Sequence, residues 1–307
     1  MRNIPLLCLL FSVTLLCTAP SCKKDKTVPE PTPAKKYIIF KFKFDSTLAR
    51  LNNLGQPAVM PAGHSALSPV FNGMCAHYVE LDPSMYTAIG GGPVLYHAPE
   101  TTAGGTTAID HSKSIIKGNN EEFLRVPLDS ITPGTYTYLR VSLAYQNYDI
   151  RYKYTYQGTP YVFTGTVASF IGYNTYINSY TIKTQTLSPS AAAGGPGNHL
   201  QGYWGFETTA LSTTNVLDGQ SPPGATTVPN PIFATSPIPQ GSCLVTGAFS
   251  SPLVITGTET ADKVVQVALS TNQSFEWKDA NMDGYYEPAA GDTVVDMGIR
   301  GLYPSVQ

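Results

Sequence analysis

The chain has 307 residues, a formal net charge of −2 at pH 7 and only 13% charged residues, where about 25% is usual in soluble proteins. Threonine, serine, asparagine, glycine, proline and 19 tyrosines take the place of the missing charges. A chain without a basic surface does not attract phosphate backbones, so we expect no nucleic-acid partner. The composition is typical of an extracellular β protein that stays soluble through hydroxyl and amide groups.

The first residues predict a lipoprotein signal peptide, residues 1–21. Arg2 gives a positive start, and the apolar run from Leu6 to Cys17 is too short to span a bilayer. The small residue Ser21 directly precedes Cys22, as a lipoprotein signal peptidase requires. We expect Cys22 to be the lipid attachment site and the membrane to be a partner through this anchor. An ordinary signal peptide that leaves Cys22 as a plain thiol is the alternative.

Residues 22–36 predict a solvated tether, because they hold charges and alternating prolines but nothing that fills a core. Lys23 follows the lipidated cysteine, where an aspartate retains well-studied lipoproteins at the inner membrane. We therefore expect an outer-membrane location, on either the periplasmic or the surface face. The folded body is expected to begin at Tyr37.

Period-two alternation recurs through the body, and no stretch keeps a 3.6-residue apolar period over three turns. The clearest predicted strands have alternating apolar residues in the ranges 38–44, 139–145, 265–269, 275–277 and 295–299. Short strands between turn signals such as Pro133-Gly134 predict an all-β fold, with one or two antiparallel β-sandwich modules of the Ig-like or Greek-key kind.

Two segments, 188–202 and 218–241, have the composition of long loops, rich in small residues, glycine and proline. We expect residues 188–202 to be a linker or long loop, because nothing in them anchors a strand. It would separate an N-terminal β-sandwich module, residues 37–187, from a C-terminal β module, residues 203–307. A single sandwich with loop excursions is the alternative.

Two residue types in the body are candidates for cross-linking or metal binding. The export compartment permits a disulfide between Cys75 and Cys243, and two separate buried thiols are the alternative. Neighbouring strands could gather two or three histidines into a metal site, although their spacing matches no ligand motif and scattered histidines are the plainer interpretation. The four histidines concerned are His64, His77, His97 and His111.

A tyrosine-rich stretch offers a candidate ligand face. Tyr152, Tyr154 and Tyr156 alternate with polar residues, which predicts a strand that carries all three on one face. Tyrosine combines a large apolar area with a hydrogen-bonding tip, so such a row suits binding of sugars or peptides. Packing through cross-strand aromatic pairs is the alternative.

A calcium-type loop is predicted at residues 279–292. Oxygen side chains at loop positions 1, 3 and 5, glycine at position 6 and a carboxylate at position 9 match the first part of an EF-hand loop. Position 12 is Ala290, so Asp292 has to close the site. The expected calcium ligands are Asp279, Asn281, Asp283, the Tyr285 carbonyl, Glu287 and Asp292. The alternative is a hairpin turn at Asp283-Gly284 whose side chains cap their own backbone.

Two resemblances add to these observations. The run Ser21-Cys22-Lys23-Lys24-Asp25 resembles the start of many exported Bacteroidota lipoproteins of uncharacterised function. In the body, the layout of Tyr78-Val79-Glu80-Leu81 and Pro133-Gly134-Thr135-Tyr136 resembles that of methanobactin-associated copper-binding proteins. This resemblance implies copper as a candidate ligand. The copper-binding histidine and tryptophan residues of that family have no assigned counterparts in this sequence.

Motifs of common enzymes, such as G-x-S-x-G and H-E-x-x-H, are missing from the sequence. We therefore expect a non-catalytic cell-envelope lipoprotein, a binding or structural module for a glycan, peptide or protein, with a structural calcium loop. A metal or small-ligand carrier of the envelope is one alternative. A glycan-active hydrolase is another, with a carboxylate pair drawn from Glu80, Glu207 and Asp218.

Overall fold

The structure is a computed structural model that describes residues 34–191, 194–239 and 242–307. The predicted signal peptide, Cys22 and most of the predicted tether lie outside these residues. From Lys35 to Gln307 the chain forms one compact unit. Within the described residues, no helix has the length and apolar character needed to cross a membrane.

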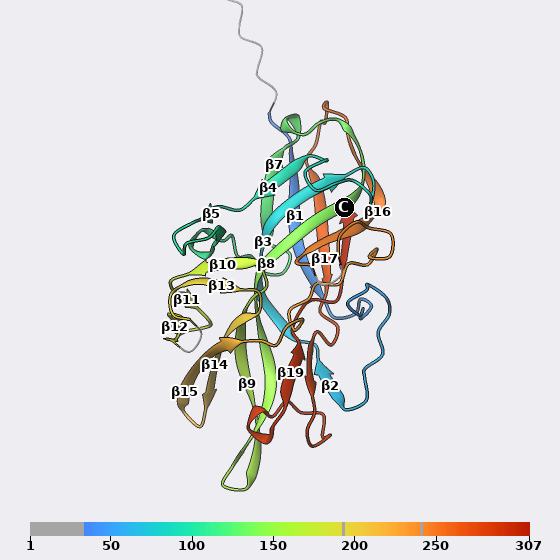
Figure 1. Ribbon diagram of the computed structural model, residues 1–307. Coiled ribbons are helices and arrows are strands. Elements are labelled where there is room, and N and C mark those ends of the chain that lie inside the picture. Colours follow the sequence, from blue (N-terminus) through green and yellow to red (C-terminus); the bar gives the residue numbers. More distant parts are fainter. Residues whose placement is uncertain (1–33, 192–193, 240–241) are drawn as a thin grey trace, which may run out of the picture. The chain divides into compact units, whose positions relative to one another are not determined.

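The compact unit is all-β, as predicted from the alternation (Figure 1). The helical elements with described bounds are single 3₁₀ turns: η1 (His111–Lys113), η2 (Leu128–Ser130) and η4 (Pro288–Ala290). Nearly all of the other regular secondary structure consists of β-strands, most of them in antiparallel pairs.

The largest sheet has seven strands and is organised around the 23-residue strand β8. β16 pairs with residues 134–142 of β8, and β9 pairs with residues 145–156, so both lie along the edge of β8 opposite β3. In spatial order the strands are β15 (Thr213–Gln220), β14 (Tyr203–Ala210), β9 (Thr159–Phe170), β8 (Gly134–Tyr156), β3 (Val70–Asp82) and β4 (Val94–His97), with β16 (Leu244–Ile255) paired to β8.

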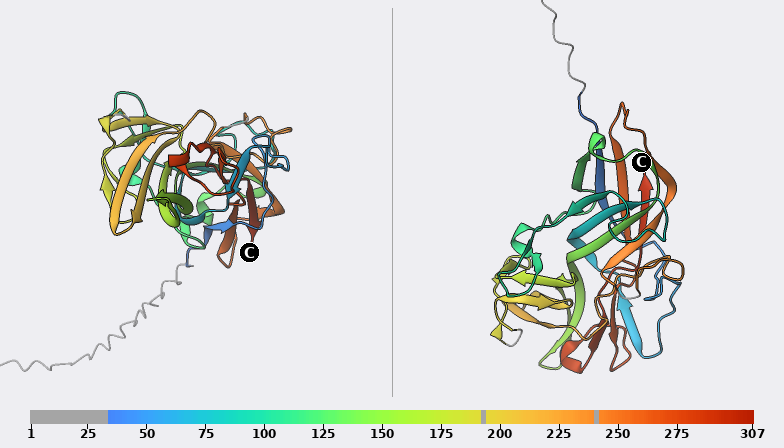
Figure 2. Two further views of the ribbon diagram at one scale, coloured as in Figure 1. Left: turned by 90° about the horizontal axis from the view of Figure 1, so that it is seen from below. Right: turned by 45° about the horizontal axis from the view of Figure 1, so that its top comes forward.

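A second sheet joins the two ends of the folded body. The first strand, β1, pairs in parallel with β17 and antiparallel with β7, while β20 pairs with β17. Figure 2 shows the blue, orange and red strands side by side near the C-terminus. The four strands are β7 (Glu122–Pro127), β1 (Tyr37–Asp45), β17 (Lys263–Ser270) and β20 (Leu302–Val306).

Three smaller sheets complete the unit. The first consists of β5 (Glu100–Thr101), β6 (Ala108–Asp110), β10 (Asn174–Ile177) and β13 (Gly197–Leu200). The second consists of β2 (His64–Leu67), β18 (Phe275–Lys278) and β19 (Thr293–Asp296). The third is the pair β11 (Tyr180–Thr181) and β12 (Thr186–Leu187).

The main core combines residues from both large sheets. Phe40 and Phe42 of β1 are fully buried, and the Phe42 ring stacks on Phe123 at 3.9 Å between centroids. The same cluster includes Leu139 and Val141 of β8. The predicted alternation at 38–44, 139–145 and 265–269 therefore marks strands whose apolar side chains fill a shared core, except Tyr145, which belongs to a second cluster.

The structure corrects the predicted boundaries of two segments. The last strand is β20, and the run predicted at 295–299 is in strand conformation only as far as Asp296. The segment 188–202, predicted to anchor no strand, contains β13, which pairs with β10. Strands from both sides of this segment share sheets: β1 with β17, and β8 with β16.

Part of the second predicted loop is buried. Ala225 and Val228 are inaccessible to solvent, and a Cβ added at Gly298 would stand 1.5 Å from the Thr227 carbonyl oxygen. Glycine at 298 thus lets this segment pass through the interior. Composition alone predicted a long loop, because such close backbone approach leaves no periodic pattern.

Candidate metal centre

Two histidines and a glutamate meet where β3, β4 and β5 adjoin. His77 lies in β3 at a bulge: its neighbours Ala76 and Tyr78 face Leu143 and Ser142 of β8, so His77 has no partner residue there. Bulges redirect side chains and are common next to functional sites. The backbone carbonyl of His77 accepts a hydrogen bond from the N–H of Ala98 at 2.7 Å, which fixes the segment after β4 beside it.

His97 ends β4 and Glu100 begins β5, three residues later. The Nε2 atom of His77 lies 2.9 Å from Oε1 of Glu100, and the Nε2 atom of His97 lies 3.5 Å from the same oxygen. One ligand atom from each residue lies within 4.8 Å of the other two. No other group of three histidine, cysteine, aspartate or glutamate residues in the described part of the chain comes so close. We call these three residues, His77, His97 and Glu100, which are a candidate site for a metal ion, the metal centre.

These distances fit a metal ion. Metal–ligand bonds of about 2.0–2.2 Å in tetrahedral geometry put neighbouring ligand atoms about 3.3–3.6 Å apart; the His97–Glu100 separation lies in this range, and the His77–Glu100 separation is shorter, as in a hydrogen bond that an ion would replace. The two imidazole rings are tilted by 66° with centroids 4.9 Å apart, so they approach from different directions. Three protein ligands leave a coordination position for water or a further ligand.

The environment favours the protonation states that a metal requires. Burial lowers the pKa of His77, and this outweighs the hydrogen bond to Glu100 that raises it. Burial by itself would raise the pKa of Glu100, but hydrogen bonds from Tyr173 and His77 bring the net pKa below its ordinary value. A neutral imidazole and an ionised carboxylate suit metal binding. The Nε2 atom of His77 would bind an ion in the tautomer that carries its proton on Nδ1, in place of the hydrogen bond to Glu100.

Tyr173 supports the metal centre from outside. Its hydroxyl donates a hydrogen bond to Oε1 of Glu100 at 2.8 Å, and its ring lies 5.5 Å from that of His77. Burial raises the pKa of Tyr173 to about 12, and the negative charge of Glu100 adds to this. The phenol therefore stays protonated and orients the carboxylate, as outer partners of metal ligands commonly do.

The other two candidate histidines have separate environments. His111 packs against the rings of Tyr145 and Phe170, and burial lowers its pKa to about 4. The Nδ1 atom of His64 lies 2.6 Å from Oε1 of Glu276. The structure thus brings together His77 and His97 of the four, contrary to the interpretation of scattered histidines.

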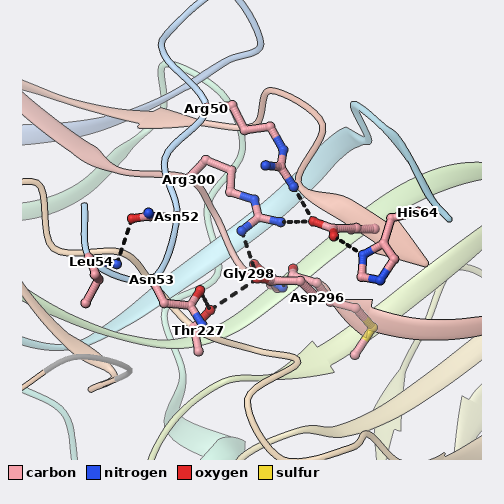
Figure 3. Close-up of polar contacts among 12 residues, drawn as sticks. Arg50, Asn52, Asn53, Leu54, His64, Thr227, Asp296, Gly298 and Arg300 are labelled. Atoms are coloured by element: carbon pink, nitrogen blue, oxygen red, sulfur yellow. Dashed lines mark hydrogen bonds and ion pairs between the residues drawn. The ribbon is translucent and has the colours of Figure 1, made fainter. Parts of the chain in front are cut away.

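His64 belongs to a buried charge network (Figure 3). Arg50, Arg300 and His64 converge on the carboxylate of Glu276, with the Arg300 contact at 3.0 Å, and Arg300 also contacts Asp296 at 2.8 Å. Burial raises the pKa of Asp296 to about 6 despite Arg300. Each arginine of this network is paired with a carboxylate. The ion pairs of Glu276 with Arg50 and His64 connect segments that are far apart in the sequence.

In the predicted calcium loop, carboxylates cap the loop's own backbone. Asp279 accepts hydrogen bonds from the N–H groups of Met282 at 2.7 Å and Gly284 at 2.8 Å. Asp292 accepts one from the N–H of Glu287 at 2.6 Å. This arrangement has the bonds that the hairpin alternative requires, and the calcium site stays a prediction.

A lysine of β8 supplies a positive charge to the same loop. The Lys153 ammonium contacts both Asp283 and Glu287, the latter at 2.9 Å, and lies 5.3 Å from the centre of the Tyr285 ring. The side-chain amide of Asn281 donates to Glu287 at 2.7 Å. Two of the expected calcium ligands, Asp283 and Glu287, thus contact Lys153, which a calcium ion would have to displace.

The tyrosine row lies in β8, as predicted, and is divided between core and surface. Tyr152 is buried, packs on Phe206 and shares a hydrogen bond with Thr208. Tyr154 and Tyr156 are 40% and 44% exposed. Tyr152 therefore has the packing role, and Tyr154 and Tyr156 remain candidate ligand residues.

The two body cysteines are free thiols placed on opposite edges of β8. Cys75 in β3 faces Tyr145, and the Cys243 carbonyl accepts a hydrogen bond from the N–H of Leu143. Two strand spacings amount to about 9.6 Å, more than the Cα separation of about 7 Å that a disulfide spans.

The carboxylates considered for hydrolysis have other partners. Glu80 pairs with the buried Arg140 at 3.1 Å. Glu207 accepts hydrogen bonds from the backbone of residues 183–185, and Asp218 accepts one from the hydroxyl of Tyr203. These bonds lower the pKa of Glu207 and Asp218 although burial opposes them, so neither is held protonated as a general acid must be.

Comparison of the chain with family models, curated proteins and solved structures finds no match. The metal centre therefore rests on its geometry. Sequence reasoning missed Glu100, and the one local signal for it is the His97-x-x-Glu100 spacing at the end of a short strand.

Proposed function

We propose that the protein is a lipid-anchored cell-envelope protein that binds one divalent transition-metal ion at the metal centre. The observation that carries this proposal is the convergence of His77, His97 and Glu100 within 4.8 Å. The lipoprotein-type start at Cys22 supports the location in the envelope, with the metal centre held beyond a tether. The assignment corresponds to the metal-carrier alternative from the sequence.

The donor set indicates the class of metal. Two imidazoles and one carboxylate suit Zn²⁺ and Cu²⁺, and copper binds such sites more tightly than zinc. The side chain of His97 is 53% exposed while that of His77 is 9% exposed. A buried ligand beside an exposed one gives the ion a route in and out, which suits a carrier. The layout resemblance to copper-binding proteins agrees with copper as the cargo.

Native mass spectrometry of the chelator-treated chain from residue 23 onward tests the proposal. We expect one Cu²⁺ per chain, and loss of tight binding in His77→Ala and His97→Ala because each removes one of three ligands. His64→Gln, which changes a histidine of the Glu276 network, is the matched control and should keep the ion. Equal copper binding by the wild type and both alanine variants would overturn the proposal.

An exposed aromatic ladder favours a second candidate function, binding of a glycan or peptide. Tyr154 faces Tyr161 across the β8–β9 hairpin, and both are about 40% exposed, as is Tyr156 beyond them. Exposed tyrosines on one sheet face offer stacking area for sugar rings. Affinity electrophoresis in neutral polysaccharides would show retardation that Tyr154→Ser and Tyr156→Ser remove and Thr155→Ser keeps; equal mobility of all four proteins contradicts it.

A further inference from the structure

A pocket of about 390 Å³ lies beside the charge network of Glu276, next to the turn at residues 52–56. Its volume is within the range of about 300–1,000 Å³ that is usual for ligand sites. The polar part of its wall consists of the charge network together with Asn52 and Asn53, and the apolar part includes Leu54 and Ala58. No residue of the metal centre lines it.

Arg50 has unused hydrogen-bonding capacity in this pocket. Its side chain is only 8% exposed, and its Nη2 atom donates to Glu276. Its Nη1 atom has no hydrogen-bond partner in the described part of the chain and is open to the pocket. Burial and the charge of Arg300 lower the pKa of Arg50, although Glu276 and Asp296 oppose this. A further negative charge in the pocket would therefore stabilise the guanidinium.

Two amides of the adjoining turn also have free N–H groups. The Oδ1 atom of Asn52 accepts hydrogen bonds from the N–H groups of Leu54 at 2.9 Å and Gln56 at 3.1 Å, so its Nδ2 atom is left for a ligand. The Oδ1 atom of Asn53 accepts one from the Thr227 hydroxyl at 2.9 Å. Both amides line the pocket beside the two arginines (Figure 3).

The side-chain acceptors of the wall are already occupied. Oε2 of Glu276 accepts from both arginines, and Oε1 lies 2.6 Å from Nδ1 of His64. Asp296 accepts from Arg300 at 2.8 Å and from the N–H of Gly298 at 2.9 Å. The remaining Nε2 atom of His64 accepts in the neutral ring and donates in the imidazolium form. The pocket thus presents mainly N–H groups.

The turn that carries the two amides is fixed before a ligand arrives. The N–H of Asn52 donates to the Gln56 carbonyl at 2.8 Å, and the N–H of Gly55 donates to the Asn52 carbonyl at 2.9 Å. Gly55 has a φ of +72°, and a Cβ there would stand 1.8 Å from the Asn230 carbonyl oxygen. The turn therefore packs directly on the buried segment 225–230, and a preformed site of this kind loses little freedom on binding.

We propose that this pocket binds a small organic carboxylate. Its oxygens accept hydrogen bonds from Arg50, Asn52 and Asn53, and its apolar part lies against Leu54 and Ala58. A carboxylate presents acceptors only, which is what a wall of free N–H groups pairs with. An ammonium group or a polyol would bring donors for which the wall has almost no free acceptor. An inorganic oxyanion would leave the apolar part of the wall in water.

Calorimetric titration of the metal-free chain from residue 23 onward tests the proposal, because carboxylates cannot then bind through a metal ion. Benzoate should bind. Benzamide has the same shape without the charge, and it should bind at least about tenfold more weakly. Acetate lacks the ring and should also bind at least about tenfold more weakly.

Asn52→Asp is the sharpest variant. It keeps the Oδ1 atom that caps the turn and replaces the free N–H₂ group by a negative oxygen, so benzoate affinity should fall at least about tenfold. Gln56→Glu is the matched control, since it adds the same charge to the same turn at an exposed side chain outside the wall. It should change benzoate affinity by less than about threefold, because solvent screens that charge.

The proposal fails if benzoate gives no heat with the wild type, or if benzamide or acetate binds as tightly as benzoate. It also fails if Asn52→Asp has the circular dichroism and the benzoate affinity of the wild type. A loss in Gln56→Glu as large as that in Asn52→Asp would place benzoate on the surface of the turn and not in the pocket.

Discussion

At the scale of the residue, the burial of His111 makes the stability of the fold depend on pH. Its ring packs on two aromatic rings, its Nδ1 atom is buried without a partner in the described residues, and desolvation lowers its pKa from 6.5 to about 4. Between these two values the unfolded chain binds a proton that the folded chain does not. The stability from this group is therefore complete above pH 6.5 and is lost as the pH falls towards 4.

We predict that His111→Phe reduces this acid sensitivity. The free energy of unfolding of the wild type should fall by up to about 3 kcal/mol more than that of the variant between pH 7 and pH 4. Urea unfolding at the two pH values measures the difference. Parallel pH dependence in both proteins would show that His111 titrates normally in the folded state.

Residue-level chemistry was only partly predictable from the sequence. The clustering of four histidines in one stretch indicated a metal site as an option, yet which two would meet depended on the bulge at His77 and on the turn between β4 and β5. Bulges leave no periodic signature, because they break the alternation by a single residue.

At the scale of the element, the acidic loop at 279–292 can be neutralised by either of two cations, the Lys153 ammonium or a calcium ion. Lys153 contacts Asp283 and Glu287 where the predicted calcium ion would lie. We predict that Lys153→Met raises terbium affinity at least about tenfold, since it removes a competing charge from an acidic loop. Luminescence sensitised by Trp277 reports binding, and calcium should compete it away.

Lys153→Arg is the matched control, because it keeps the positive charge and should bind terbium as weakly as the wild type. Absence of signal in all three proteins would leave the backbone-capped hairpin as the sole account of this loop. The loop's oxygen pattern was visible in the sequence, but the lysine is 130 residues away, and no local pattern pairs it with the loop.

Strand positions were predicted best where apolar alternation was strict. The ranges 38–44 and 265–269 lie within β1 and β17, whereas the parallel pairing of these two strands could not be predicted, since alternation contains no information about partners. Residues 225–230 show the opposite failure, because a buried segment without regular secondary structure, held by close glycine contacts, has the composition of a loop.

At the scale of the whole molecule, the two ends of the folded body depend on each other. β1 lies between β7 and β17, and residues 134–142 of β8 lie between β3 and β16. We predict that residues 37–187 alone do not fold, because without β16 and β17 they leave two sheet edges and a large apolar face exposed. Near-ultraviolet circular dichroism of this fragment should be flat, while residues 37–307 give a native spectrum and one unfolding transition.

A native-like spectrum of the fragment would instead support the two independent modules expected from composition. The same comparison bears on the metal centre, whose ligands all lie within residues 77–100. If the fragment is unfolded, it should also lose tight copper binding, because β3 and β4 would no longer hold the two histidines together.

The central claim, a metal ion held by His77, His97 and Glu100, is tested most directly by crystals of the protein soaked in Cu²⁺ and measured at the copper absorption edge. The account predicts one anomalous peak about 2.0–2.2 Å from Nε2 of His77, Nε2 of His97 and a carboxylate oxygen of Glu100. A peak at the 279–292 loop alone, or a soaked crystal with no peak at these three residues, would contradict it.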